Sequence, residues 1–413
     1  MFYGWRIVGV GALAQAISVG ATFYAYGALL KPVAAEFEAS RLAVTLGLTL
    51  LTLVQGVVAP FLGRAIDAGW VRGVLIVGVV IQACGMLLLA RATAFWQVGL
   101  LFATAVSVGS TCFGPLATAS LVANWFMRGR GRALGLTALG AALGGGVFPP
   151  LVTWLIAELG WRGAVAAMGV GVLVLVAPFA WIVVARPEEI GSAPDGELLA
   201  EGAASSEAGE LAAAPSTAEL VRTRNFWAIS MAIGLAFCPV SVLLAHLVPY
   251  ITDLGHSPAR AALVMSVYAF SSGIGRVVFG SLADRVDKRI AAWISFGCLT
   301  IAWSGLLGGP PFAVLIVAAA GSGLGMGGIA PLWGALTGAA FGRASFGRVM
   351  GLMNLLMLPF SMLGAPAAAH LFDRTGSYQL AFSLFLAFFV LAACSLGLLR
   401  LPESEPGTEG QGA

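Results

Sequence analysis

The sequence predicts an all-α membrane protein whose twelve transmembrane helices form two six-helix bundles. The first observation behind this prediction is composition: 59% of the 413 residues are hydrophobic and 10% are charged, whereas soluble domains carry about 25% charged residues. The second is length, because twelve apolar stretches each reach the roughly 20 residues that cross about 30 Å of hydrocarbon. The third is a charged motif that occurs once in each half of the chain.

The twelve predicted helices follow one another with mostly short connections. Their approximate ranges are 5–30, 42–62, 73–91, 96–124, 133–157, 163–185, 226–250, 260–281, 290–308, 312–339, 350–370 and 378–400. The chain contains 55 glycines, which suits helices in lipid because small residues let backbones approach closely. All five cysteines lie inside these stretches without metal-ligand spacing, so we interpret them as packing residues. We expect no metal site and no cofactor.

The basic residues predict the orientation. With both termini in the cytoplasm, 15 of the 22 lysines and arginines lie on the cytoplasmic side and five on the outer side, as the positive-inside rule requires. Only two of the 22 are lysines, and this preference for arginine is typical of GC-rich bacteria. The expected location is the bacterial cytoplasmic (inner) membrane. The net charge of +3 follows from this topology and does not indicate nucleic-acid binding.

One segment near the middle of the chain differs from the rest. Residues 186–224 are acidic, rich in Ala, Ser and Gly, and contain no aromatic residue, so they cannot bury enough apolar surface to fold alone. We expect a flexible cytoplasmic linker between an N-terminal bundle (1–185) and a C-terminal bundle (225–401). Residues 402–413 are expected to form a cytoplasmic tail.

The two halves repeat each other at equivalent places. Segment 63–72 follows the second helix and segment 280–289 follows the eighth, and their Gly, Asp and Arg residues coincide at a displacement of 217. "RALGL" (132–136) and "RVMGL" (348–352) coincide at a displacement of 216. Two matches at nearly one displacement indicate a parallel internal repeat.

The first of these repeats resembles a known signature. "GRAIDAGWVR" (63–72) and "GSLADRVDKR" (280–289) are similar to the loop that the major facilitator superfamily carries once per half, although Ala68 replaces the usual Arg. The resemblance implies two bundles around a central cavity that rock between two states. Ordinary positive-inside loops are the alternative, but they leave the repeated Asp unexplained. We expect a conformational latch formed by Asp67, Arg72, Asp284, Arg285 and Arg289.

Within that superfamily the chain resembles the monocarboxylate transporter family and its bacterial relatives. The resemblance covers the chain outside the linker and tail. It rests on "YGW" (3–5), "NWFMRGRGRALGLTALG" (124–140), "GWRG" (160–163), "HLVPYITDLG" (246–255) and "GIGRVVFGSLADR" (273–285). It implies secondary active transport of small monocarboxylates such as lactate or pyruvate, with proton coupling left open.

One arginine is predicted to lie deep in the membrane. Arg276 is 16 residues from Arg260 and eight from Asp284, about 24 Å and about 12 Å along a helix. A cation at this depth costs roughly 2.5–3.5 kcal/mol even on lenient scales, and no carboxylate is predicted nearby. Such a guanidinium suits a bidentate carboxylate substrate, which the equivalent arginine binds in the resembled family. A packing arginine bonded to helix carbonyls and water is the alternative.

Two further residues bear on proton coupling. Ser272 occupies the position where proton-coupled members of the family often carry Asp; it can bond substrate or water but does not titrate near neutrality. His246, toward the outer end of the seventh helix, is the candidate proton carrier, with packing or gating as the alternative. Lys31 lies about 39 Å along the first helix from Trp5. We expect it to snorkel at the cavity mouth, with a relay role as the alternative.

Three residues are weaker candidates for the cavity wall. Gln15 lies near the midplane of the first helix, Phe113 in the Gly-rich middle of the fourth, and Trp333 after a Gly-rich run in the tenth. Apolar and aromatic walls around one cation suit a short-chain carboxylate. Packing within a bundle is the alternative for all three.

The predicted function is alternating-access transport of a small organic anion by a protein that works as a monomer in the bilayer. The alternatives are oxalate/formate-type dicarboxylate exchange, drug efflux, and a membrane sensor. Segment 350–369 in the eleventh helix is uncharged, whereas oxalate–formate antiporters, which the chain also resembles, carry a second buried base there. An enzyme is not expected, because we find no phosphate-binding loop, metal constellation or nucleophile–base pair at membrane depth.

Overall fold

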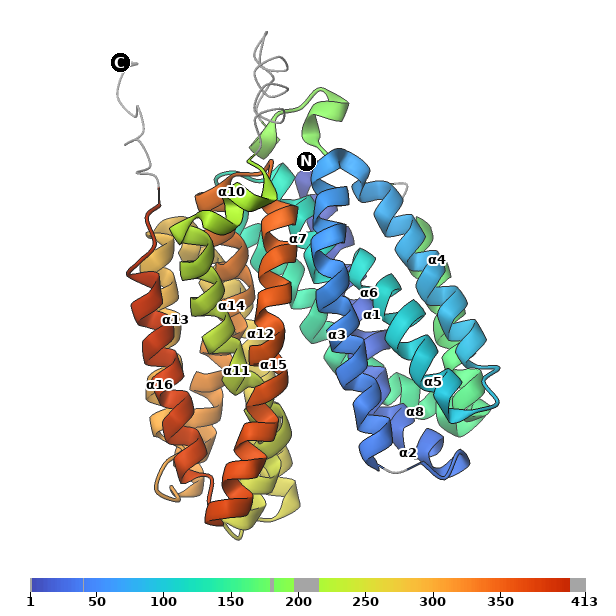
Figure 1. Ribbon diagram of the computed structural model, residues 1–413, viewed down its shortest axis with the longest axis vertical. Coiled ribbons are helices and arrows are strands. Elements are labelled where there is room, and N and C mark those ends of the chain that lie inside the picture. The colour runs from blue at the N-terminus through green and yellow to red at the C-terminus, as the bar shows by residue number, and fades with distance from the viewer. Residues whose placement is uncertain (1, 40, 179–181, 197–214, 402–413) are drawn as a thin grey trace.

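The computed structural model describes residues 2–39, 41–178, 182–196 and 215–401. The predicted tail (402–413) and residues 197–214 of the predicted linker lie outside this part. The described helices form two bundles (Figure 1). The bundles lie against each other at the end where residues 186–224 connect them, which we call the linker end. In the view of Figure 1 they diverge toward the opposite end, which we call the far end.

The N-terminal bundle is built from helices with several interruptions. Its first four crossings are α1 (Gly4–Val19), η1 (Gly20–Tyr24) and α2 (Ala25–Glu36); α3 (Arg41–Ala65); α4 (Val71–Leu89); and α5 (Phe95–Leu101), η3 (Phe102–Val106), α6 (Ser107–Phe113) and α7 (Pro115–Trp125). The turns η1 and η3 are π-helical, and so is η2 (Ile66–Trp70), which joins α3 to α4. Helix α8 (Arg130–Val176) bends at Gly160, where φ is 69°, and supplies the fifth and sixth crossings.

The C-terminal bundle is more regular. After the short turns η5 (Pro187–Ile190) and η6 (Pro194–Gly196) and the short helix α10 (Thr217–Arg222), each crossing is one helix. These helices are α11 (Arg224–Asp253), α12 (Pro258–Arg285), α13 (Lys288–Ser304), α14 (Phe312–Phe341), α15 (Phe346–Thr375) and α16 (Gln379–Leu396). The side chains of Thr223, Ser257 and Asp287 accept N–H groups at the starts of α11, α12 and α13, which satisfies donors that the helices cannot pair internally.

The described residues contain nine helical stretches that are long and apolar enough to cross a membrane. Two of them, Thr49–Leu89 with 41 residues and Arg130–Val176 with 47, contain a sharp turn at Gly69 or Gly160 and therefore cross twice. The shorter apolar helix α13 completes the set of twelve. The predicted fold class, an all-α membrane protein of two six-helix bundles, is confirmed.

Glycines allow the two bundles to touch at the linker end. A Cβ atom at Gly63 of α3 would lie 2.1 Å from the carbonyl oxygen of Gly347 in α15, and one at Gly280 of α12 would lie 2.5 Å from that of Gly131 in α8. Residues with side chains could not pack at these distances. The two bundles therefore meet through backbone contacts, α3 against α15 and α8 against α12.

Close helix packing at a glycine also occurs within the N-terminal bundle, between α1 and α8, and can be tested there. A Cβ at Gly140 would lie 1.9 Å from the carbonyl oxygen of Ala12, whereas one at Gly146, six residues further along α8, meets open space. We expect Gly140→Ala to destabilise the protein by about 1–3 kcal/mol through overpacking. Gly146→Ala should leave the thermal unfolding midpoint in detergent unchanged. Equal midpoints for the two variants would contradict the close α1–α8 contact.

Candidate functional site

Arg276 lies at the contact between the two bundles. It is nine residues before the end of α12 at Arg285, about 14 Å from the linker end. Its Nη1 donates a hydrogen bond to the backbone carbonyl of Ala138 in α8, and its Nε is buried without a hydrogen-bond partner. The guanidinium of one bundle thus binds the backbone of the other and keeps a donor available for a further partner.

Three hydroxyl-bearing residues can be placed relative to this guanidinium. Tyr268 and Ser272 lie eight and four residues before Arg276, which places all three on one face of α12. Tyr24, from η1 in the other bundle, and Tyr268 are the titratable groups that interact electrostatically with Arg276. Tyr268 is buried, whereas Tyr24 is 41% exposed. Among the described residues, no carboxylate forms an ion pair with Arg276.

This arrangement is suited to binding an oxyanion. A guanidinium can donate two parallel hydrogen bonds to a carboxylate, and a tyrosine or serine hydroxyl can donate another. Because Tyr24 and Arg276 belong to different bundles, an anion that contacts both would connect the bundles. Sequence reasoning missed both tyrosines. The spacing of Tyr268, Ser272 and Arg276 along one helix face is the signal that could have identified Tyr268.

The three predicted wall residues lie inside the bundles. Gln15 is buried and donates a hydrogen bond of 2.8 Å to the hydroxyl of Thr118. Phe113 is completely buried, and the Trp333 indole, which is 8% exposed, contacts the Met353 sulfur at 3.3 Å. The hydrogen bond of Gln15 and the sulfur contact of Trp333 each stay within one bundle, and the place of the three residues in a cavity wall stays a prediction.

His246 lies far from Arg276 along the membrane normal. It is 22 residues from the start of α11 at the linker end, about 33 Å, whereas Arg276 is about 14 Å from the same end. Its Nδ1 is 3.2 Å from the Tyr378 hydroxyl and its Nε2 is 3.0 Å from the Ala365 carbonyl oxygen. Since a carbonyl only accepts, Nε2 carries a proton. Lys31 lies in α2, but its side chain is outside the described part of the structure.

Two carboxylates form hydrogen bonds from one bundle to the other at the linker end. The Asp67 carboxylate accepts hydrogen bonds of 2.8 Å from the backbone N–H groups of Gly347 and Arg348, in the first turn of α15. The Asp284 carboxylate accepts bonds of 2.6 Å from those of Gly131 and Arg132, in the first turn of α8. Each half therefore places an acid on a helix N-terminus of the other half, where unpaired N–H groups and the helix dipole favour negative charge.

The start of the predicted linker joins the same contact. Arg343, between α14 and α15, pairs at 2.8 Å with Glu188 of η5, and both side chains are mostly buried. The Arg186 guanidinium donates to the backbone carbonyl of Asp67 at 3.1 Å. The Asp195 carboxylate accepts from the backbone N–H groups of Met127 and Arg128. Sequence reasoning missed Glu188 and Arg343, and the acidic, aromatic-free composition gave no signal for them.

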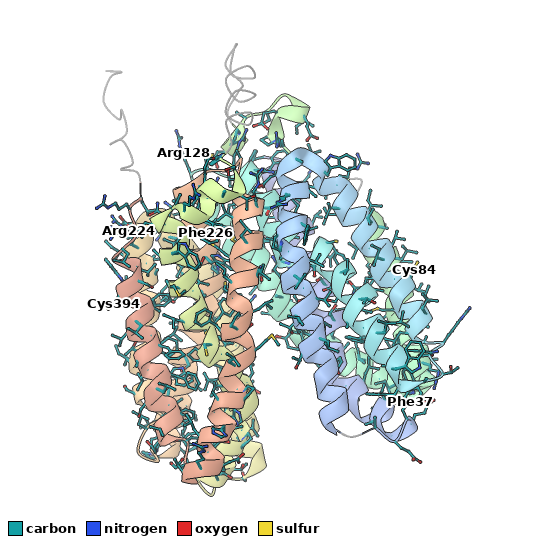
Figure 2. All side chains as sticks on the ribbon, in the orientation of Figure 1. Phe37, Cys84, Arg128, Arg224, Phe226 and Cys394 are labelled. Atoms are coloured by element: carbon teal, nitrogen blue, oxygen red, sulfur yellow. The ribbon has the colours of Figure 1, made fainter. Side chains whose placement is uncertain are left out.

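The other three predicted latch residues are arginines. Arg72 and Arg285 are exposed. Arg289 pairs with Asp287 at 2.8 Å within the C-terminal bundle, and its hydrogen bonds hold the pKa of Asp287 below the usual range. Figure 2 shows Arg128 and Arg224 near the linker end and Cys84 and Cys394 on the outer sides of the bundles. Asp67 and Asp284 are predicted latch residues that the structure brings to the other half.

Comparison with known proteins identifies the family. A family model described as Major Facilitator Superfamily matches residues 12–301 and 230–413. The chain belongs to the major facilitator superfamily. This member is 30% identical to monocarboxylate transporter 13 of Bos taurus, over 97% of this chain and 89% of that protein. It is 27% identical to monocarboxylate transporter 11 of Mus musculus, over 98% and 88%.

Solved structures show the same fold. A bacterial homologue of the iron transporter ferroportin, in an outward-facing state, superimposes with a TM-score of 0.72 at 17% identity, covering 96% of this chain and 98% of that one. A double Trp mutant of XylE gives a TM-score of 0.78 at 13% identity, covering 97% and 96%. At these identities the likeness concerns the fold alone.

The carboxylate on α8 can be tested by one substitution. In Asp284→Asn the side chain has one acceptor oxygen and no charge, so we expect the linker ends of the bundles to separate more often. Pulsed EPR distances between labels at Met127 and Arg285, which are exposed on different bundles, should shift toward longer values. Asp287→Asn, in the same loop but bonded within one bundle, serves as the control. Unchanged distances in Asp284→Asn would contradict the role of this contact.

Proposed function

We propose that this member of the superfamily is a secondary transporter of small monocarboxylates and that Arg276 binds the substrate carboxylate. The observation that carries the proposal is a buried guanidinium with an unpartnered Nε and no carboxylate partner among the described residues. Such a charge is costly in a membrane unless an anion compensates it. The proposal is supported by relatives named monocarboxylate transporters.

The absence of charge in residues 350–369 favours one carboxylate over two. Residues 350–369 of α15 contain no charged residue, so this helix offers no second base for a dicarboxylate. Tyr24, Tyr268 and Ser272 add hydroxyl donors, which suit a carboxylate or a hydroxyl group beside it. Dicarboxylate exchange and drug efflux are the competing functions, and a panel of labelled solutes in reconstituted vesicles distinguishes them.

The closed linker end supports a transport cycle by alternating access. We infer that this end faces the cytoplasm of a bacterial cell, with both termini inside, because basic residues concentrate there. The conformation described here is then outward-facing. An anion that contacts Arg276 and Tyr24 would stabilise states in which the bundles approach each other, and this differential binding would drive the change. In this proposal one copy of the chain suffices, since one pair of bundles contains the complete site.

Arg276→Lys tests the assignment of the carboxylate-binding residue. A single ammonium cannot reproduce the planar two-point contact of guanidinium. We expect the loss of about 1.5–3 kcal/mol, or roughly ten- to hundredfold weaker substrate binding, with normal expression and folding. The measurement is uptake and equilibrium binding of labelled lactate and pyruvate in reconstituted vesicles. Arg260→Lys, at the exposed far end of the same helix, is the matched control. Near-normal uptake by Arg276→Lys would refute the assignment.

Proton coupling requires a titrating group other than Arg276, which stays protonated throughout the working range. Ser272 cannot supply it, so our candidate is His246. Its ring nitrogens both have partners: Nε2 donates to the Ala365 carbonyl, and Nδ1 lies at the Tyr378 hydroxyl, which can either donate or accept. The separation of roughly 20 Å from Arg276 along the helices means that such coupling would act through conformation or through water.

His246→Gln tests this hypothesis. Glutamine keeps hydrogen-bonding capacity but does not titrate near pH 6–7. We expect the variant to lose accumulation driven by an inward pH gradient and to retain counterflow exchange, since exchange needs only binding and rocking. Full gradient-driven accumulation by the variant would refute a role for His246 in coupling.

A further inference from the structure

A large apolar cavity lies within the N-terminal bundle, toward the far end. Its volume is about 610 Å³, and its walls come from α2, α3, α5, η3, the end of α4 and the part of α8 that follows the bend at Gly160. The lining side chains are apolar apart from the Tyr26 hydroxyl and the indole nitrogens of Trp96 and Trp161. An empty apolar cavity of this size is costly, and water is not expected to fill it without polar partners.

This cavity is separate from the surroundings of Arg276. Tyr26, Leu29 and Val33 of α2 line the cavity and are buried, and their i, i+3, i+7 spacing places them on one helix face. Tyr24, which interacts with Arg276, and Gly27 are exposed on another face of the same crossing. The first crossing therefore separates two spaces, one between the bundles and one inside the N-terminal bundle.

The exposed wall residues indicate that the cavity opens sideways into the bilayer. Leu50 of α3, Trp96 and Leu100 of α5 line it and are 47%, 64% and 53% exposed. Large apolar side chains exposed along a membrane-spanning helix contact lipid. The medium at this opening is therefore hydrocarbon rather than water, and a lipid chain can enter without crossing a polar layer.

One cation at the rim is available to a headgroup. Arg162, next to the lining residue Trp161, is neutralised by Glu36, whose pKa is held below its usual range by hydrogen bonds from Arg162 and Trp161. Arg91 follows the lining residue Leu89 by two positions and is exposed. It has no ion-pair partner within the described ranges. Among the described side chains at the far-end rim, Arg91 is therefore a positive charge without an ion-pair partner, at the level expected for lipid phosphates.

We propose that the cavity binds one acyl chain of a membrane phospholipid whose phosphate lies at Arg91. The apolar walls accept the chain, the lateral opening admits it from the bilayer, and the arginine matches the negative charge of the headgroup. The bound chain contacts the parts of α2, α3 and η3 that approach the far end. The proposal depends on the chain being embedded in a membrane and not on which solute it transports.

Photolabelling of the full-length protein tests the proposal. The probe is a phosphatidylglycerol with a diazirine in the middle of one acyl chain, included in reconstituted phosphatidylcholine vesicles. Leu29, Val33 and Ala103 are buried wall residues that annular lipid cannot reach. We expect the probe to label peptides at these residues, in addition to exposed positions such as Val174 of α8.

Two glycine substitutions provide a matched pair. A Cβ at Gly99, which lines the cavity, meets open space, and so does one at Gly171 of α8, which does not line it. Gly99→Phe should place an aromatic ring in the cavity and exclude the acyl chain, which should abolish labelling of the buried wall residues while labelling at Val174 persists. Gly171→Phe should leave both unchanged. Arg91→Gln should reduce labelling of the wall by the phospholipid probe.

Three outcomes would overturn the proposal. They are absence of labelling at the buried wall residues in the wild-type protein, wall labelling that survives in Gly99→Phe, and wall labelling by a diazirine fatty acid without labelling by the phospholipid. Folding of each variant is checked by its retention of labelling at Val174 and by its elution as a single species in detergent.

Discussion

The contact between the bundles depends on backbone N–H groups that have no partner within their own helices. Helices α8 and α15 both begin at the linker end, and the first N–H groups of any α-helix lack intrahelical acceptors. Asp284 and Asp67 supply acceptors from the opposite half. Hydrogen bonds to a charged group contribute about 1.5–3 kcal/mol each, and water can replace them when the bundles separate. Such a contact favours one conformation without making the other inaccessible.

Arg276 shows the same constraint, because it also presents N–H donors that need acceptors. Here a donor in the membrane lacks an acceptor, and the single carbonyl of Ala138 satisfies only part of the guanidinium. At the linker end the protein supplies both the Asp67 and Asp284 carboxylates and the backbone N–H groups that they accept from. At Arg276 it supplies one partner, and the remainder of the pairing is left to a ligand. A fully paired polar contact stabilises one conformation. A polar group left partly unpaired in a low-dielectric site is costly, and a ligand that pairs with it lowers that cost.

The sequence allowed the fold to be predicted because each crossing must satisfy its own backbone in lipid. Apolar length, the positive-inside bias and the internal repeat are all local patterns. Arg276 could be predicted for the same reason, since a charge deep in an apolar run is conspicuous. Gln15, Phe113 and Trp333 could not be placed, because depth along a helix does not specify which face points inward. The ion pair between Glu188 and Arg343 could not be predicted, because it depends on how a polar segment folds back onto the bundles.

The π-helical turn η1 makes the orientation of α2 depend on the exact number of residues in the first crossing. A π-helical turn adds about one residue to an α-helical path, so the helix beyond it is rotated by about 100° relative to an uninterrupted helix. This rotation sets the direction in which Tyr24, Tyr26, Leu29 and Val33 point relative to the side chains of α1. Removing a single residue between Gly20 and Tyr24 would turn every side chain of α2 by that angle while leaving the apolar composition intact. Over evolutionary time this stretch should therefore tolerate substitutions far better than insertions or deletions, although it lies in an otherwise simple hydrophobic helix.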